Sequence, residues 1–271
     1  MGRRAALVIA THVLDEDTTR ERGAELEKVT VPTLSAANWG GQGLHLRGNI
    51  EGFLRASSKH KWLEVHGREH WAEFYTDYGV ERQRRFFDHF LHGKDNGWDR
   101  QPSLLLNIRH PDGTFTRRTE PAWPLPNTRF TKLYLDKDTL TKKPGGAGKV
   151  EFDTNEGGVT FTSEPLEHQT EITGPLAARL FVSSSTTDAD LFLVVRAFSQ
   201  DGEEVLFQGA LDSYSAVSKG WLRASQRKPD PVRSTLYRPY HTHDEIQPLT
   251  PGQTYQLDIE IWPTCVVLPS G

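Results

Sequence analysis

The stretch that decides the fold of the first half of the chain is residues 61–91, KWLEVHGREHWAEFYTDYGVERQRRFFDHFL. Residues 61–67 form a short apolar run typical of a buried strand, and residues 71–91 follow with the spacing of an amphipathic helix. Four apolar side chains of this helix are expected on one core-facing side: Phe86, Phe87, Phe90 and Leu91. The stretch therefore predicts a strand, a turn that carries two histidines, and a helix.

The residues upstream repeat this order. Residues 30–37 have the composition of a strand, and residues 44–57 have that of a helix. Strands that alternate with helices are typical of an α/β sheet with crossover helices. We therefore expect residues 1–125 to form one α/β unit.

Beyond residue 125 the pattern changes to short alternating stretches separated by Gly, Pro, Asp and Asn. In residues 255–261 apolar side chains occupy every second position, which predicts a strand with one buried face. Residues 159–162 and 178–182 show the same alternation over shorter spans. Residues 126–271 are therefore expected to form a β-sandwich or jelly roll.

The composition excludes several classes of protein. The 271 residues carry a net charge of −4, and no basic cluster exceeds the arginines of residues 82–85, so we expect no nucleic-acid partner. The longest apolar runs, such as residues 191–195, are far shorter than the roughly 20 residues of a membrane span. Residues 1–10 are basic and then apolar but make a poor signal peptide. With Cys265 as the only cysteine, we expect no disulfide and a cytoplasmic location.

Both ends of the chain suggest a fragment. Two confident parallel strands are too few to build an α/β sheet with two covered faces. The apolar run at residues 266–268 lies three residues from Gly271, so we expect a sandwich that is cut off with unpaired apolar edges. Such a chain is expected to be poorly soluble or to form a homo-oligomer.

His66 and His70 are the strongest candidates for chemistry. They flank a turn after a predicted strand, and open α/β sheets place functional groups at the carboxyl ends of their strands. Histidine suits a general base because its pKa lies near neutrality. Two alternatives remain: a structural role in capping or hydrogen bonding, and a zinc site. The zinc site is disfavoured because Gly67 stands where the zincin pattern needs Glu.

Other reactive groups have simpler interpretations. His241 and His243 lie in a proline-rich stretch without a third ligand, so a surface loop is expected and no metal or other cofactor is predicted. Cys265 is expected to be a buried strand residue. The sequence contains no Gly-x-Ser-x-Gly, so it offers no nucleophile elbow.

Several motifs in order resemble the X-Pro dipeptidyl-peptidase and cocaine-esterase-like hydrolases. In the first half they are residues 31–49 (VPTLSAANWGGQGLHLRGN), 61–71 (KWLEVHGREHW), 85–93 (RFFDHFLHG) and 102–109. In the second half they are residues 184–193, 220–225 (GWLRAS) and 249–255 (LTPGQTY). The resemblance implies part of an α/β-hydrolase sheet followed by an incomplete jelly roll.

The same resemblance implies a Ser, Asp and His triad in which His70 is the histidine and His66 the weaker candidate. The serine would lie upstream of Met1. The acid is expected two residues after Trp39, where this chain has Gly41. Glu64, Glu69, Asp77, an upstream residue or none could take its place, and the sequence does not decide between them.

Two functions follow. The first is the C-terminal part of a serine hydrolase acting on small esters or X-Pro peptides, inactive as a separate chain. The second is a non-catalytic jelly-roll binding protein or an inactive truncated paralogue. An in-frame upstream extension with Gly-x-Ser-x-Gly would favour the first, and a true start at Met1 would favour the second.

Overall fold

The computed structural model of the chain describes residues 14, 21, 23–210 and 212–271. Its helices are α3 (Leu46–Arg55), α4 (His70–Phe74) and α5 (Asp77–His92), with single 3-10 turns at Leu26–Lys28, Trp98–Arg100 and Ala224–Gln226. Its strands are β1 (Thr33–Asn38), β2 (Lys61–His66), β3 (Leu104–Arg109), β4 (Phe115–Glu120), β5 (Tyr134–Asp136), β6 (Thr139–Thr141), β7 (Thr162–Ser163), β8 (Thr170–Val182), β9 (Asp190–Val195), β10 (Ser218–Arg223) and β11 (Tyr255–Leu268).

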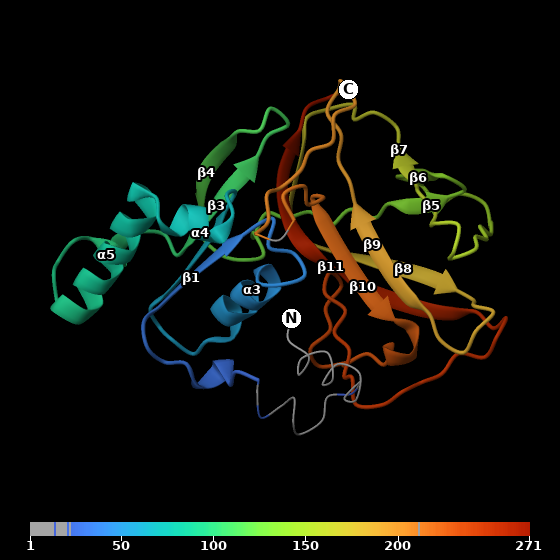
Figure 1. Ribbon diagram of the computed structural model, residues 1–271, viewed down its shortest axis with the longest axis horizontal. Helices are drawn as coiled ribbons and strands as arrows, with labels where there is room; N and C mark the ends of the chain where they lie inside the picture. The colour runs from blue at the N-terminus through green and yellow to red at the C-terminus, as the bar shows by residue number, and fades with distance from the viewer. Residues whose placement is uncertain (1–13, 15–20, 22, 211) are drawn as a thin grey trace.

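One mixed sheet joins the two halves of the described chain. Its order is β1-β2-β3-β11-β10-β9, with β4 paired to β3 and β8 paired to β11. The pairs β1–β2, β2–β3 and β3–β11 are parallel, whereas the remaining pairs of this sheet are antiparallel. In Figure 1 the helices lie beside β1 to β4, and the strands after β4 form the other side of the molecule. A small second sheet contains β5, β6 and β7.

The strand and helix predictions for residues 30–67 are confirmed. α3 lies within its expected range, β1 begins within its expected range but runs one residue past it to Asn38, and β2 ends at His66. α3 buries Leu46, Ile50 and Phe53 in the same core as Leu63 and Val65 of β2. This apolar face, spaced as an amphipathic helix requires, fixes α3 as the crossover between the parallel strands β1 and β2.

The prediction of one helix over residues 71–91 is wrong in two respects. The structure has two helices, because Thr76 is extended and its side chain caps α5 by accepting a hydrogen bond from Gly79 N. A side chain at Gly79 would collide with the carbonyl oxygen of Glu73, so the chain turns back sharply there. The expected apolar stripe is also split, since Phe87 and Leu91 are 51% and 71% exposed.

The alternation in residues 255–261 correctly predicts the start of β11, whose Leu257, Ile259 and Ile261 are buried. The run at residues 266–268 is not an unpaired edge. It pairs with β8 on one side, and Val266 pairs with Arg109 of β3 on the other. The strand expected at residues 159–162 is confined to Thr162–Ser163.

A single core connects the helical and the all-β halves. It contains Trp39 after β1, Leu106 of β3, Phe207 from a loop of the second half and Val266 of β11. Within the described residues, no helix has the length and apolarity needed to cross a membrane.

Candidate functional site

Three polar side chains form a row across the carboxyl ends of β1, β2 and β3. Asn38 and His66 are register partners in the parallel pair β1–β2. Val65 pairs with Leu106, so the next residues, His66 and Asn107, are also neighbours. All three are buried, with exposed fractions of 1%, 2% and 6% in chain order. This row lies where open α/β sheets hold their functional groups.

The turn after β1 is held against this row. The backbone N–H of Trp39 donates to His66 O at 3.0 Å, and its indole Nε1 donates to Asn107 O at 2.8 Å. A side chain at Gly40 would collide with the backbone of Gln208, so the two loops meet backbone to backbone. The loop around Gln208 therefore forms one wall of the site.

The turn after β2 carries the predicted histidines. Nδ1 of His66 lies 2.8 Å from Arg68 O, and a carbonyl can only accept, so Nδ1 carries a proton. A side chain at Gly67 would collide with the ring of Phe115 from β4, so only glycine lets the turn pack here. The structure places His70 at the first residue of α4, with Glu69 as the N-cap residue. Its role as a catalytic base stays a prediction.

A cavity of about 300 Å³ opens beside this turn. It is lined by Arg68, Glu73, Thr76, Tyr78, Asn107, Phe115 and Arg117. The guanidinium of Arg117 lies 3.6 Å from the centre of the Tyr78 ring, and its Nη2 lies 3.3 Å from a carboxylate oxygen of the buried Glu73. The positive charge of Arg117 is thus balanced within the wall of the cavity.

Glu64, one of the acids left open by the sequence, is engaged elsewhere. Its carboxylate lies 2.6 Å from Nε of Arg82 and accepts a hydrogen bond from Tyr78 Oη at 2.9 Å. Burial raises the pKa of Glu64 despite the nearby guanidinium, and burial followed by the Glu64 charge raises the pKa of Tyr78 to about 12. Glu64 therefore ties β2 to α5. Asp77 is exposed in the first turn of α5.

The sequence missed Asn38 as a site residue. Its amide oxygen is buried and has no hydrogen-bond partner among the described residues, and the same is true of Asn107 Oδ1. A polar residue that directly follows an apolar strand was the available signal, but the strand was expected to end at Ala37.

The other reactive groups lie apart from this row. Cys265 is buried in β11, as predicted, and burial raises the pKa of its thiol to about 12. His241 is also buried, and burial lowers its pKa to about 4. In the part of the chain that the structure describes, no three His, Cys, Asp or Glu side chains gather as metal ligands would.

Comparisons with known proteins point to one group of hydrolases. The family model of the X-Pro dipeptidyl-peptidase C-terminal non-catalytic domain matches residues 96–271. A protein from Streptomyces avermitilis named as an Xaa-Pro dipeptidyl-peptidase is 27% identical over 258 residues, covering 78% of this chain and 36% of the relative. The cocaine esterase of a Rhodococcus species is 25% identical over 163 residues, covering 45% of this chain and 28% of the relative.

A solved structure extends the likeness to nearly the whole chain. The crystal structure of a CocE/NonD family hydrolase from Staphylococcus aureus matches with a TM-score of 0.93 and 30% identity. The match covers 98% of this chain and 49% of the other. The chain thus spans about half the length of that hydrolase and about a third of the Streptomyces and Rhodococcus relatives.

Proposed function

Because the chain belongs to the family defined by the X-Pro dipeptidyl-peptidase C-terminal non-catalytic domain, we propose that it is the C-terminal part of a serine hydrolase. The resemblance seen in the sequence motifs is to this same group, whose named members include dipeptidyl-peptidase and esterase. The proposed substrates are acyl esters or X-Pro amides. We assign residues 1–125 to an α/β-hydrolase domain and residues 126–271 to its jelly roll.

One observation carries this proposal. The family model begins at residue 96, whereas the match to the Staphylococcus aureus hydrolase covers 98% of the chain. The match therefore includes most of the residues before 96, among them β1, α3 and β2 with the turns that follow both strands. Those turns bring Trp39, His66 and the start of α4 together at one edge of the sheet, where a hydrolase would place its base.

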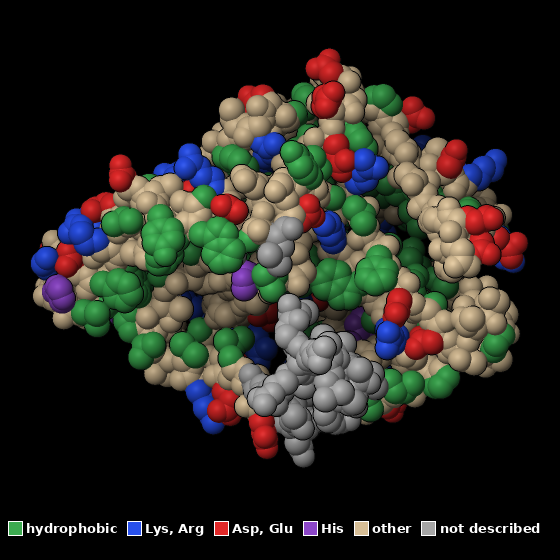
Figure 2. Space-filling model, in the orientation of Figure 1, with side chains coloured by type: hydrophobic (Ala, Val, Ile, Leu, Met, Phe, Trp, Pro, Cys, Tyr) green, Lys and Arg blue, Asp and Glu red, His purple; other side chains and the backbone are tan. Residues whose placement is uncertain are grey.

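The exposed apolar surface of α4 and α5 supports the proposal that this chain is part of a larger protein. Figure 2 shows hydrophobic side chains gathered over α4 and α5. Six large ones are exposed in these helices and the link between them: Trp71, Phe74, Tyr75, Val80, Phe87 and Leu91. Beyond them β1 is the last strand of the described sheet on this side. A further hydrolase segment could pair with β1 and cover this surface.

In the proposed mechanism His70 takes the proton of a serine hydroxyl as that oxygen attacks the carbonyl carbon of the substrate. It then returns the proton to the leaving alcohol or amine, and a water molecule repeats the cycle to release the acid. The 271 residues contain no Gly-x-Ser-x-Gly, so the nucleophile would come from a segment outside them.

A second function has some support in the sandwich. On β9 and β10, register partners Phe192 and Trp221 are both exposed, Phe192 by 75%. Exposed aromatic side chains on a sheet face favour a binding role for the jelly roll. The family model itself describes a non-catalytic domain.

Serine-directed fluorophosphonate labelling separates the two functions. The 271-residue chain is expected to give no label and no esterase rate above that of its His70→Ala variant. A chain extended along the coding sequence upstream of Met1 is expected to contain Gly-x-Ser-x-Gly and to be labelled at that serine. Labelling of the 271-residue chain, or an upstream sequence without such a serine, would contradict the proposal.

A further inference from the structure

Arg109 is a half-buried cation that makes no ion pair with a described carboxylate. It is the last residue of β3, and its Nε donates to Leu206 O at 3.1 Å. Its Nη1 and Nη2 have no hydrogen-bond partner among the described residues, and neither atom is sealed from solvent. Burial lowers the pKa of Arg109, and the charge of Asp112 offsets only part of this effect. Since a guanidinium keeps its charge in proteins, the carboxyl end of β3 presents charged donors without an acceptor.

The carboxylates near this guanidinium have other partners. Oδ1 of Asp112, in the turn after β3, accepts hydrogen bonds from the backbone N–H and the hydroxyl of Thr114 at 2.9 and 2.7 Å. The carboxylate of Glu204 accepts hydrogen bonds from Nε and Nη2 of Arg196 at 2.9 and 2.6 Å. The charge of Arg109 is therefore not balanced by either of them.

A second cavity, of about 440 Å³, opens beside Arg109. It is lined by Arg109, Glu204, Leu206, Phe207, Gln208, Ser213 and Tyr214. Because Arg196 already neutralises Glu204, the cavity keeps one unbalanced positive charge. The planar fork of a guanidinium matches the two oxygens of a carboxylate, and the apolar and aromatic part of the lining suits a small organic group beside them. The cavity is therefore suited to an organic carboxylate.

The charge of the cavity favours a singly charged ligand over a phosphate. A phosphate monoester carries about −1.5 to −2 charges at pH 7. Arg109 balances one of these charges, and the excess would lie in the same cavity as the carboxylate of Glu204. A neutral amide of the same shape would leave the guanidinium unpaired. A carboxylate is the group that matches both the charge and the geometry of Arg109.

This cavity adjoins the candidate site through two contacts. The guanidinium of Arg109 lies 5.2 Å from the centre of the Phe115 ring, and the same ring fills the space beside Gly67 in the histidine turn. On the other wall, Gln208 O accepts a hydrogen bond from Asn38 Nδ2 at 3.1 Å. Both contacts lie at the carboxyl edge of the parallel strands. A single aromatic ring thus links Arg109 to the histidine turn.

We propose that this cavity binds a carboxylate of the substrate, held by the guanidinium of Arg109. The inference rests on the proposed function, which places the reaction at the neighbouring histidine turn. Arg109 is then a specificity-determining residue that takes no part in bond breaking. The preferred substrates are esters or X-Pro amides with a carboxylate in their acyl or leaving part.

Benzoate and benzamide test the site in the 271-residue chain, because they share a shape and only benzoate is charged. Isothermal titration calorimetry is expected to show benzoate binding about 10-fold or more tightly than benzamide or inorganic phosphate. In NMR spectra benzoate is expected to shift the backbone amide signals of Ser213 and Tyr214. Equal binding of benzoate and benzamide, tighter binding of phosphate, or shifts confined to other parts of the chain would overturn the proposal.

Two variants and a matched control assign the binding to Arg109. Arg109→Met keeps an apolar stem against Phe115 but removes the charge, and is expected to weaken benzoate binding about 10-fold or more. Arg109→Lys is expected to retain part of the affinity, because it keeps the charge without the planar fork. The control is Arg179→Met, since the exposed Arg179 pairs with Asp258 outside this cavity. Equal losses for Arg109→Met and Arg179→Met would overturn the assignment, and the benzoate and benzamide comparison needs no variant to fold.

The chain extended upstream of Met1, the extended hydrolase, tests whether the carboxylate belongs to the substrate. One pair of esters is 4-acetoxybenzoate and its methyl ester, in which the leaving part is charged or neutral. The other pair is p-nitrophenyl hydrogen succinate and its methyl ester, in which the acyl part is charged or neutral. Arg109→Met is expected to lower the charged-to-neutral ratio of kcat/KM about 10-fold or more in at least one pair. The intrinsic reactivity of each ester cancels, because both enzymes are compared on the same substrates.

The inference and the proposed function can fail separately. If benzoate binds but neither ratio depends on Arg109, the cavity does not serve the substrate, whereas fluorophosphonate labelling still decides whether the extended chain is a serine hydrolase. Benzoate that binds the 271-residue chain but not the extended hydrolase would show that the upstream segment fills the cavity, and would also overturn the inference. A ratio that falls in Arg109→Met and not in Arg179→Met supports it.

Discussion

Replacement of Arg82 by Met should strongly destabilise the chain. Arg82 is the cation beside the buried carboxylate of Glu64, with Nε 2.6 Å from the nearer oxygen, and its guanidinium lies 5.2 Å from the centre of the Trp98 ring. Met retains an apolar side chain against Trp98 but leaves the carboxylate of Glu64 without its ion pair. Removing one partner of a buried pair costs about 3–5 kcal/mol, which agrees with about 4 kcal/mol for charges near 4 Å at an effective dielectric of 20.

The loss should depend on pH with a defined sign. Burial already raises the pKa of Glu64 above its ordinary value of 4.5, and loss of Arg82 raises it further. A carboxyl whose folded pKa is raised contributes stability below its unfolded pKa and loses it as pH rises through the folded pKa. The deficit of Arg82→Met should therefore be smallest near pH 4.5 and grow toward neutrality, by at most about 1.4 kcal/mol per pH unit.

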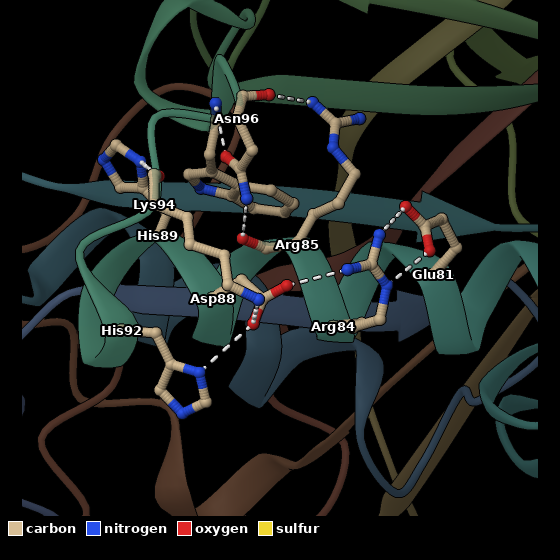
Figure 3. A network of polar contacts seen from close by, with 9 residues as sticks. Glu81, Arg84, Arg85, Asp88, His89, His92, Lys94 and Asn96 are labelled. Atoms are coloured by element: carbon tan, nitrogen blue, oxygen red, sulfur yellow. Dashed lines mark hydrogen bonds and ion pairs between the residues drawn. The ribbon is translucent and has the colours of Figure 1, made fainter.

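Urea unfolding followed by tryptophan fluorescence measures this deficit. The matched control is Arg84→Met on the same helix, because the Arg84 side chain is exposed and pairs with Glu81 and Asp88, as Figure 3 shows, and Asp88 keeps Lys94 as a second partner. That change should cost less than about 1 kcal/mol. Adding Glu64→Gln to Arg82→Met should recover about half of the loss, since Tyr78 can still donate to the amide oxygen. Equal losses for Arg82→Met and Arg84→Met, or a deficit that shrinks as pH rises, would refute this reasoning.

Two further predictions concern buried titrating groups. Cys265 is buried and the pKa of its thiol is raised to about 12, so native protein at about pH 8 should react with a thiol reagent at least ~100-fold more slowly than unfolded protein; comparable rates would show that the thiol is accessible. Burial lowers the pKa of His241 from 6.5 to about 4, so the unfolded chain binds a proton at higher pH and stability falls as pH drops through this window. His241→Asn should therefore lose less thermal stability than the wild-type chain between neutrality and about pH 4, and an equal or larger loss would contradict the neutral buried ring.

The parts of the fold that depend on local pattern were predictable. β1, α3 and β2 follow from local sequence pattern, because α3 buries one apolar face and β2 is a short strand buried on both faces. The break between α4 and α5 was not, since the helical spacing continues across Thr76 and only the close approach of Gly79 to Glu73 O marks it. The placement of residues 266–268 depends on a strand about 160 residues upstream, which no local pattern reveals.

In the candidate site, too, only the residues marked by a local pattern could be predicted from the sequence. The histidine turn was recognisable because a polar loop directly follows a strand. Asn38 was not recognisable, because its amide donates to Gln208 O, which is 170 residues away. Its amide oxygen also fills the space that a side chain at residue 41 would need, and Gly41 leaves that space open. Glu64 was one of the candidates for the triad acid, but its partners Tyr78 and Arg82 lie on a helix whose orientation the sequence does not give.

The ratio of kcat/KM between the extended hydrolase and its His70→Ala variant tests the central claim most directly. With a p-nitrophenyl ester or an X-Pro p-nitroanilide as substrate, loss of the base should lower kcat/KM about 10³-fold or more, because the serine then keeps its proton. The variant should unfold at the same urea concentration as the parent. A ratio below about 10 with an unchanged fold would contradict the assignment of His70 as the base of a serine hydrolase.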